Sequence, residues 1–78
     1  MYNQAKLEIL AAVQTIGELT SMEISLITGR TPENSSMLLL KYHRMGLLSR
    51  RKLQGKLRGY SLTQRGRERL EWLESDEE

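Results

Sequence analysis

The sequence predicts a small α+β domain in the order helix, short strand, helix, helix, β-hairpin, helix. Two observations lead to this fold class. Apolar residues recur at helical spacing before residue 46 and after residue 63, and two short strand-like runs flank a glycine-containing turn between them. The 78 residues suffice for one domain with a modest core. We assign residues 1–74 to this domain and expect residues 75–78 to form a disordered acidic tail.

The first helix is predicted over residues 2–16, where apolar side chains form one stripe: Ala5, Ile9, Ala12, Val13 and Ile16. Leu7 and Leu10 widen the stripe, which fits either a broad core face or a contact with a partner chain. Gly17 ends the helix. The next three residues are expected to form a single β-bridge.

Two further helices are predicted over residues 21–28 and 32–45. Thr20 and Glu23 have the spacing of a capping box at the start of the first, and Thr31 followed by Pro32 starts the second. The second helix should direct these side chains to the core: Ser35, Leu38, Leu39, Tyr42 and Met45. Helices joined by such a short turn with a glycine form a helix-turn-helix, whose second helix enters the major groove of DNA.

The start of that second helix carries short polar side chains, which allow a close approach to base edges: Thr31, Asn34, Ser35 and Ser36. The alternative is that they only serve the start of the helix. Met37 and Leu40 are apolar residues on the outer face. They fit contacts with thymine methyl groups or, equally, a protein-binding surface.

The hairpin is predicted from strands over residues 48–52 and 57–62, with Gly55 at the turn. Its apolar anchors are Leu48, Tyr60 and Leu62, all at the end nearest the helices. A last helix, capped by Thr63, is expected to run to residue 73. A glycine inside that helix, at position 66, predicts close packing of backbone against a neighbouring element.

Positive charge is concentrated in one part of the chain. Residues 41–69 contain ten Lys and Arg residues and one acid, whereas residues 71–78 contain five acids and no base. Such a basic surface attracts nucleic acid by neutralising phosphates. The bases expected to contact DNA are Lys41, Arg44, Arg50, Arg51, Lys52, Lys56 and Arg58.

Several functional classes are disfavoured. The chain has no cysteine and a single histidine, His43, so we expect no metal site and no cofactor. No catalytic constellation is readable, so we expect no enzyme. No apolar run approaches the roughly 20 residues of a membrane span. The N-terminus lacks the pattern of a signal peptide, so we expect a cytoplasmic protein.

Three short motifs resemble the winged helix-turn-helix family, in particular MarR- and PadR-type transcriptional regulators. They are Gly17-Glu18-Leu19-Thr20, Leu39-x-x-Tyr42-x-x-x-Gly46-Leu47-Leu48-x-Arg50, and Leu62-Thr63-x-x-Gly66-x-x-x-Leu70. The resemblance implies a recognition helix over residues 32–45, a basic hairpin that acts as the wing, and a homodimer on a pseudo-palindromic site. The sequence departs from the families at Tyr42, where leucine is commoner. It also lacks the long extra helices that serve dimerisation and effector binding.

Two functions remain open from the sequence. The first is a small DNA-binding transcriptional regulator, dimeric through its first and last helices and without a small-molecule effector. The alternative is a winged-helix module that binds another protein through Met37, Leu40 and Trp72, with Leu7 as a further contact.

Overall fold

The computed structural model describes residues 4–76, which form four helices and one two-stranded antiparallel sheet. The elements are α1 (Gln4–Ile16), α2 (Ser21–Thr28), α3 (Pro32–Arg44), β1 (Leu48–Lys52), β2 (Arg58–Leu62) and α4 (Gln64–Asp76). This is the α+β order that the sequence predicts. Among these residues no helix is long and apolar enough to cross a membrane.

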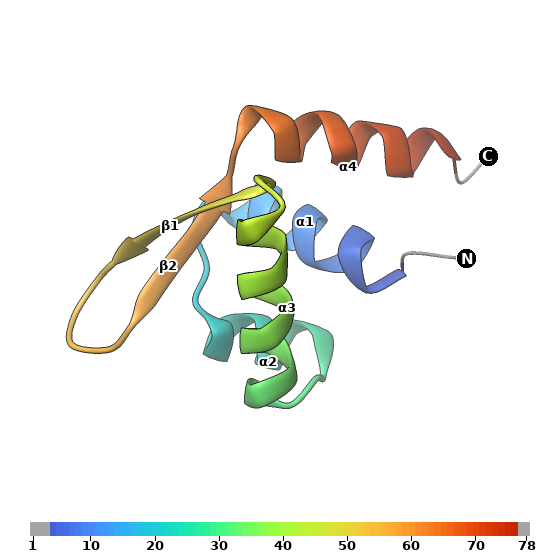
Figure 1. The fold of residues 1–78 in the computed structure, drawn as a ribbon. Coiled ribbons are helices and arrows are strands. Elements are labelled where there is room, and N and C mark those ends of the chain that lie inside the picture. Colours follow the sequence, from blue (N-terminus) through green and yellow to red (C-terminus); the bar gives the residue numbers. More distant parts are fainter. Residues whose placement is uncertain (1–3, 77–78) are drawn as a thin grey trace.

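The helices form the body, and the hairpin projects from one side of it (Figure 1). Helix α1 packs against α2, α4 and β2, while α3 packs against α2 and β1. The free ends of α1 and α4 lie on the side of the body opposite the hairpin (Figure 1). The hairpin therefore reaches outward next to the end of α3 that leads into β1.

One core joins all six elements. Its buried side chains are Ile9, Leu10, Val13, Leu19, Ile24, Leu39, Tyr42, Leu47, Leu48, Tyr60, Leu70 and Leu73. One expectation for α1 is corrected, because Ile16 is 60% exposed, whereas the burial of Leu10 agrees with the broad core face. The buried face of α1 is formed by Ile9, Leu10 and Val13, and Ile16, the last residue of the helix, is not part of it.

Local and distant contacts fix the start of α2 and the turn between α2 and α3. Thr20 and Glu23 form the predicted capping box: the Glu23 backbone N–H donates to the Thr20 hydroxyl (3.3 Å), and the Thr20 N–H donates to the Glu23 carboxylate (2.8 Å). The Thr31 hydroxyl accepts the backbone N–H of Asn34 at the start of α3 (3.1 Å). Arg30 donates to Glu8 of α1 (3.2 Å), which ties the turn to the body.

The hairpin pairs Leu48 with Leu62 and Lys52 with Arg58 at its two ends. The predicted β-bridge is confirmed, because Leu19 exchanges two backbone hydrogen bonds with Tyr60 (2.9 and 2.8 Å). Strand β2 is thus flanked by β1 on one side and by Leu19 on the other. This places a third extended segment beside the base of the hairpin.

Helix α4 begins as predicted, with the Gly66 N–H donating to the hydroxyl of Thr63 (2.9 Å). The prediction for Gly66 is also confirmed, because a Cβ there would meet the backbone carbonyl oxygen of Leu47. The helix is longer than predicted and continues to Asp76. Residues 75 and 76, expected in a disordered tail, are therefore helical, while residues 77 and 78 lie outside the described part of the chain.

Candidate nucleic-acid interface

The start of α3 presents part of the polar set that the sequence predicts. Thr31, Asn34 and Ser36 are exposed. Pro32 occupies the first turn, where its missing N–H leaves no hydrogen bond unmade. The first turns of the helix therefore expose two polar side chains, those of Asn34 and Ser36, to solvent.

Ser35 is a correction to the predicted base contacts. Its side chain is fully buried, so it cannot lie near bases in this structure. The physical reason is helical phase, because Ser35, Leu39 and Tyr42 follow the i, i+4, i+7 spacing of the core face. A small side chain at this position allows α3 to approach the body closely.

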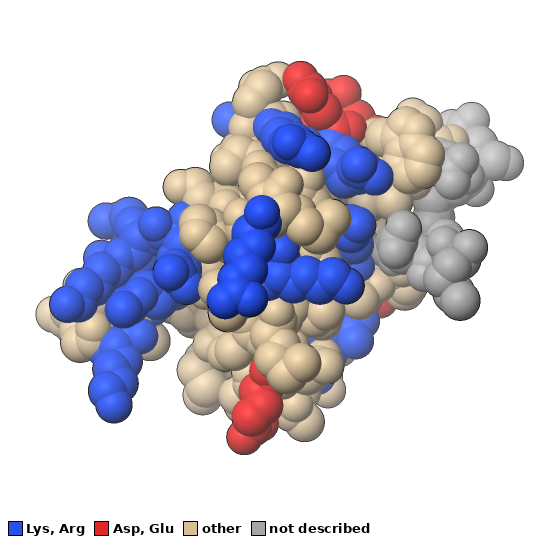
Figure 2. All heavy atoms as spheres, in the orientation of Figure 1, with Lys and Arg blue, Asp and Glu red and all other residues tan. Residues whose placement is uncertain are grey.

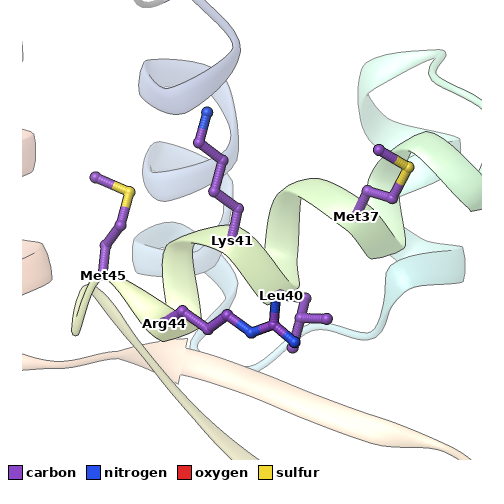
Figure 3. Close-up of a pocket in the computed structure, with 5 residues that line it drawn as sticks. All are labelled: Met37, Leu40, Lys41, Arg44 and Met45. Atoms are coloured by element: carbon purple, nitrogen blue, oxygen red, sulfur yellow. The ribbon is translucent and has the colours of Figure 1, made fainter.

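The outer face of α3 combines apolar and basic side chains. Met37 is 68% exposed, and Leu40 is half-buried. Together with Lys41, Arg44 and Met45 they line a hollow of about 440 Å³ (Figure 3). The hollow lies along the half of α3 that leads to β1. This face can therefore contact both phosphates and apolar groups such as thymine methyls.

The hairpin carries the densest group of bases. Arg50, Arg51, Lys52 and Lys56 are exposed, and Arg58 is half-buried. In the view of Figure 2, Lys and Arg atoms cover the hairpin, and others lie over α3 and over the start of α4. Basic side chains from separate parts of the chain are thus gathered on one face.

Arg51 differs from the other bases of the hairpin because it is engaged by an acid. Its guanidinium donates twice to the Glu18 carboxylate, with Nε to Oε2 at 2.7 Å and Nη2 to Oε1 at 2.9 Å. These hydrogen bonds lower the pKa of Glu18 and raise that of Arg51. The sequence interpretation missed Glu18. A contact between residues 33 positions apart leaves no local signal.

Helix α4 adds bases that the sequence did not assign to a site. Arg69 lies over the ring of Trp72, with 5.4 Å from the guanidinium carbon to the ring centroid. Both line a hollow of about 420 Å³ with Arg65 and Glu68. Trp72 is 55% exposed there, in a different hollow from that of Met37 and Leu40. Met37 and Leu40 therefore line one hollow, and Trp72 lines another.

No group of three or more potential metal ligands occurs within residues 4–76. His43 has a structural contact, because its Nδ1 lies 2.9 Å from the carbonyl oxygen of Leu48. The carbonyl can only accept, so Nδ1 carries the proton in this contact. His43 therefore secures the junction between α3 and β1.

Comparisons with known proteins place this geometry in context. No protein-family model matches the sequence, and no curated protein matches it. Solved structures do match. The YusO protein from Bacillus subtilis superposes with a TM-score of 0.89 at 21% identity, over 95% of this chain and 54% of YusO. A MarR family protein from Bacillus stearothermophilus gives 0.82 at 20% identity, over 95% of this chain and 52% of that protein.

A third solved structure is BpsR from Bordetella bronchiseptica, described as a protein whose DNA binding is regulated by 6-hydroxynicotinic acid. It has a TM-score of 0.81 at 17% identity, over 90% of this chain and 50% of BpsR. The chain spans about half the length of these three proteins. At such identities the likeness establishes the fold, which confirms the resemblance predicted from the three motifs. The chain has the winged helix-turn-helix fold that these proteins share, with α2 and α3 as the helix-turn-helix and the hairpin as the wing.

Proposed function

We propose that the protein binds double-stranded DNA sequence-specifically and acts as a small transcriptional regulator. The observation that carries the proposal is the gathering of the wing's bases and those of α3 on one face (Figure 2). The fold shared with a MarR family protein supports it, as does the description of BpsR as a DNA-binding protein. We infer a cytoplasmic homodimer that assembles through α1 and α4, and we assign it no small-molecule effector.

In this proposal α3 enters the major groove with its first turns near base edges. Asn34 and Ser36 are exposed there, and an asparagine side chain can pair with adenine through two hydrogen bonds. Lys41 and Arg44, further along the same helix, contact phosphates. The hydroxyl of Thr31 already accepts the backbone N–H of Asn34, so its main role is capping.

The wing lies along the adjacent backbone or minor groove, with Arg50, Lys52, Lys56 and Arg58 near phosphates. Two strands with few apolar side chains at their tip are marginally stable on their own. We infer that the tip becomes more ordered when phosphates neutralise its charges.

The test is a salt titration of binding to a fluorescent random duplex, measured by anisotropy. Log affinity should fall linearly with log salt, with a slope of about −0.9 for each phosphate neutralised. Arg50→Gln should make the slope shallower by about 0.9. Arg67→Gln is the matched control, because this exposed base on α4 lies outside the proposed interface. Absence of binding at low salt would refute the proposal.

Sedimentation equilibrium with and without duplex tests the dimer. The inferred assembly through α1 and α4 should give two chains per pseudo-palindromic duplex. One chain per duplex, with a monomer in its absence, would contradict this part of the proposal.

A second candidate function is docking of another protein on the α3 hollow. The observation that favours it is the exposed Met37 beside Leu40, since flexible methionines are common on surfaces that bind proteins. Met37→Gln keeps both length and charge. If this variant loses a protein captured from cell extract and still binds DNA normally, the hollow serves a protein. If it loses only DNA affinity, the hollow faces the bases.

A further inference from the structure

The contact between Glu18 and Arg51 spans the whole width of the sheet. Leu19, next to Glu18, pairs with Tyr60 at one edge of β2, whereas Arg51 belongs to β1 at the other edge. The Glu18 side chain therefore crosses β2 to reach the guanidinium, with N–O distances of 2.7 and 2.9 Å. It joins the segment before α2 to the outer strand of the wing.

The crossing point is a glycine. Gly59 is the residue of β2 paired with Arg51, and it is buried. A Cβ at this position would lie 2.7 Å from both Cδ and Oε2 of Glu18, closer than a Cβ normally comes to atoms of another residue. The φ of Gly59 is not in the positive range that requires glycine. What this position needs is space, and the Glu18 side chain occupies that space.

We propose that Glu18 and Arg51 form a brace across Gly59 that sets the orientation of the wing, so that Arg51 is a positioning residue and not a phosphate contact. This inference rests on the proposed DNA-binding function. Two nitrogens of the Arg51 guanidinium, Nε and Nη2, already donate hydrogen bonds to the Glu18 carboxylate. Arg50 and Lys52, its neighbours on β1, form no ion pair with any residue of the described chain 4–76.

The position of the pair explains why it can matter despite its exposure. An exposed ion pair contributes little to the stability of a folded domain. The wing is different, because its apolar contacts with the core lie at its base, through Leu48, Tyr60 and Leu62. A two-point hydrogen-bonded contact beyond that base restricts the angle at which the outer bases meet DNA.

Two explanations of the Glu18–Arg51 pair predict opposite changes in DNA affinity for the variant Glu18→Gln. If Glu18 only competes with phosphates for Arg51, then Glu18→Gln removes a negative charge and should strengthen DNA binding. If the pair is a brace, Glu18→Gln should weaken binding about two- to fivefold at every salt concentration, with the slope unchanged. Arg51→Gln should do the same, and the double variant should lose no more than either single one.

Arg50→Gln is the matched control for Arg51→Gln, since it removes one charge from the adjacent residue. It should lower the slope by about 0.9, whereas Arg51→Gln should leave it unchanged. An equal loss of slope in both variants would assign Arg51 to a phosphate and overturn the proposal. Wild-type protein that fails to bind duplex at low salt would instead refute the function, so the two failures are distinguishable.

Gly59→Ala tests the brace without changing any charge. The new methyl group must displace the end of the Glu18 side chain, so binding should fall about as much as in Glu18→Gln. Ser61→Ala, on the same face of β2, is the steric control and should bind as wild type does.

Amide hydrogen exchange gives a readout that is independent of DNA, and it remains informative if Gly59→Ala folds poorly. The brace predicts faster exchange at residues 49–52 in Glu18→Gln, with the helices unchanged. Tighter DNA binding by Glu18→Gln, or wing exchange equal to that of the wild type, would overturn the proposal.

Discussion

Replacing Gly66 with alanine tests how closely α4 lies on the rest of the fold. Gly66 is buried in the first turns of α4. A Cβ there would overlap the carbonyl oxygen of Leu47 and lie 2.6 Å from Cδ2 of Leu62. The same carbonyl oxygen accepts the backbone N–H of Thr63 (3.1 Å). The new methyl group would therefore push apart the junction of α3 and β1 and the start of α4.

Two effects of opposite sign decide the size of the change. Alanine in a helix interior is favoured over glycine by about 1 kcal/mol. Against this, overpacking costs about 1–3 kcal/mol, and a weakened hydrogen bond from Thr63 to Leu47 costs about 1 kcal/mol more. The overlapping atom belongs to the backbone and cannot rotate away, so the steric cost dominates. We expect a net destabilisation of about 1–3 kcal/mol.

Urea unfolding followed by circular dichroism measures this change in free energy. In thermal unfolding, the Tm should fall by roughly 4–8 °C per kcal/mol in a domain of this size. Gly59→Ala is the matched control, because its Cβ meets only the flexible end of Glu18. Its free energy of unfolding should change by less than about 1 kcal/mol. If Gly66→Ala is stabilised by about 1 kcal/mol, helix propensity alone decides and the close approach inferred here is wrong.

Three further predictions concern stability. Leu39→Ala should lower the free energy of unfolding by about 2–5 kcal/mol in urea, because this fully buried residue leaves a cavity. Thr20→Ala should cost about 1 kcal/mol in the same assay, because the Glu23 N–H loses its cap. Arg51 holds the pKa of Glu18 below its ordinary 4.5. The stabilisation is therefore present above pH 4.5 and lost as pH falls through the lowered pKa, so the urea midpoints of Glu18→Gln and wild type should converge at low pH.

Local chemistry explains why much of the fold could be predicted from the sequence. The capping box of Thr20 and Glu23 depends on residues three positions apart. Gly55 has the positive φ that the hairpin turn requires. The end of α4 was harder to predict, because acidic residues disfavour the C-terminal end of a helix. In the structure Leu70 and Leu73 anchor that helix in the core, and each residue added beyond them gains a backbone hydrogen bond.

The candidate site was less predictable because polarity alone does not fix a residue's role. Ser35 satisfied two patterns at once, as a short polar residue at the start of a recognition helix and as a member of the core stripe. The structure decides in favour of the core, because the helical repeat places Ser35 on the buried face of α3 together with Leu39. Asn34 and Ser36, its direct neighbours, are exposed. The position of a side chain around the helix therefore decides which polar residues can reach a base.

In the wing, charge alone likewise does not fix the role of a residue. Arg50 and Arg51 are adjacent bases of one strand, and a count of charges treats them alike. The pleat directs them to opposite faces of the sheet. Only the face of Arg51 is reached by Glu18, whose side chain crosses Gly59 on β2. Long-range pairing thus separates a base available to phosphate from one that holds the wing. The sign of the Glu18→Gln effect on DNA binding and the salt slopes of Arg50→Gln and Arg51→Gln test that separation directly.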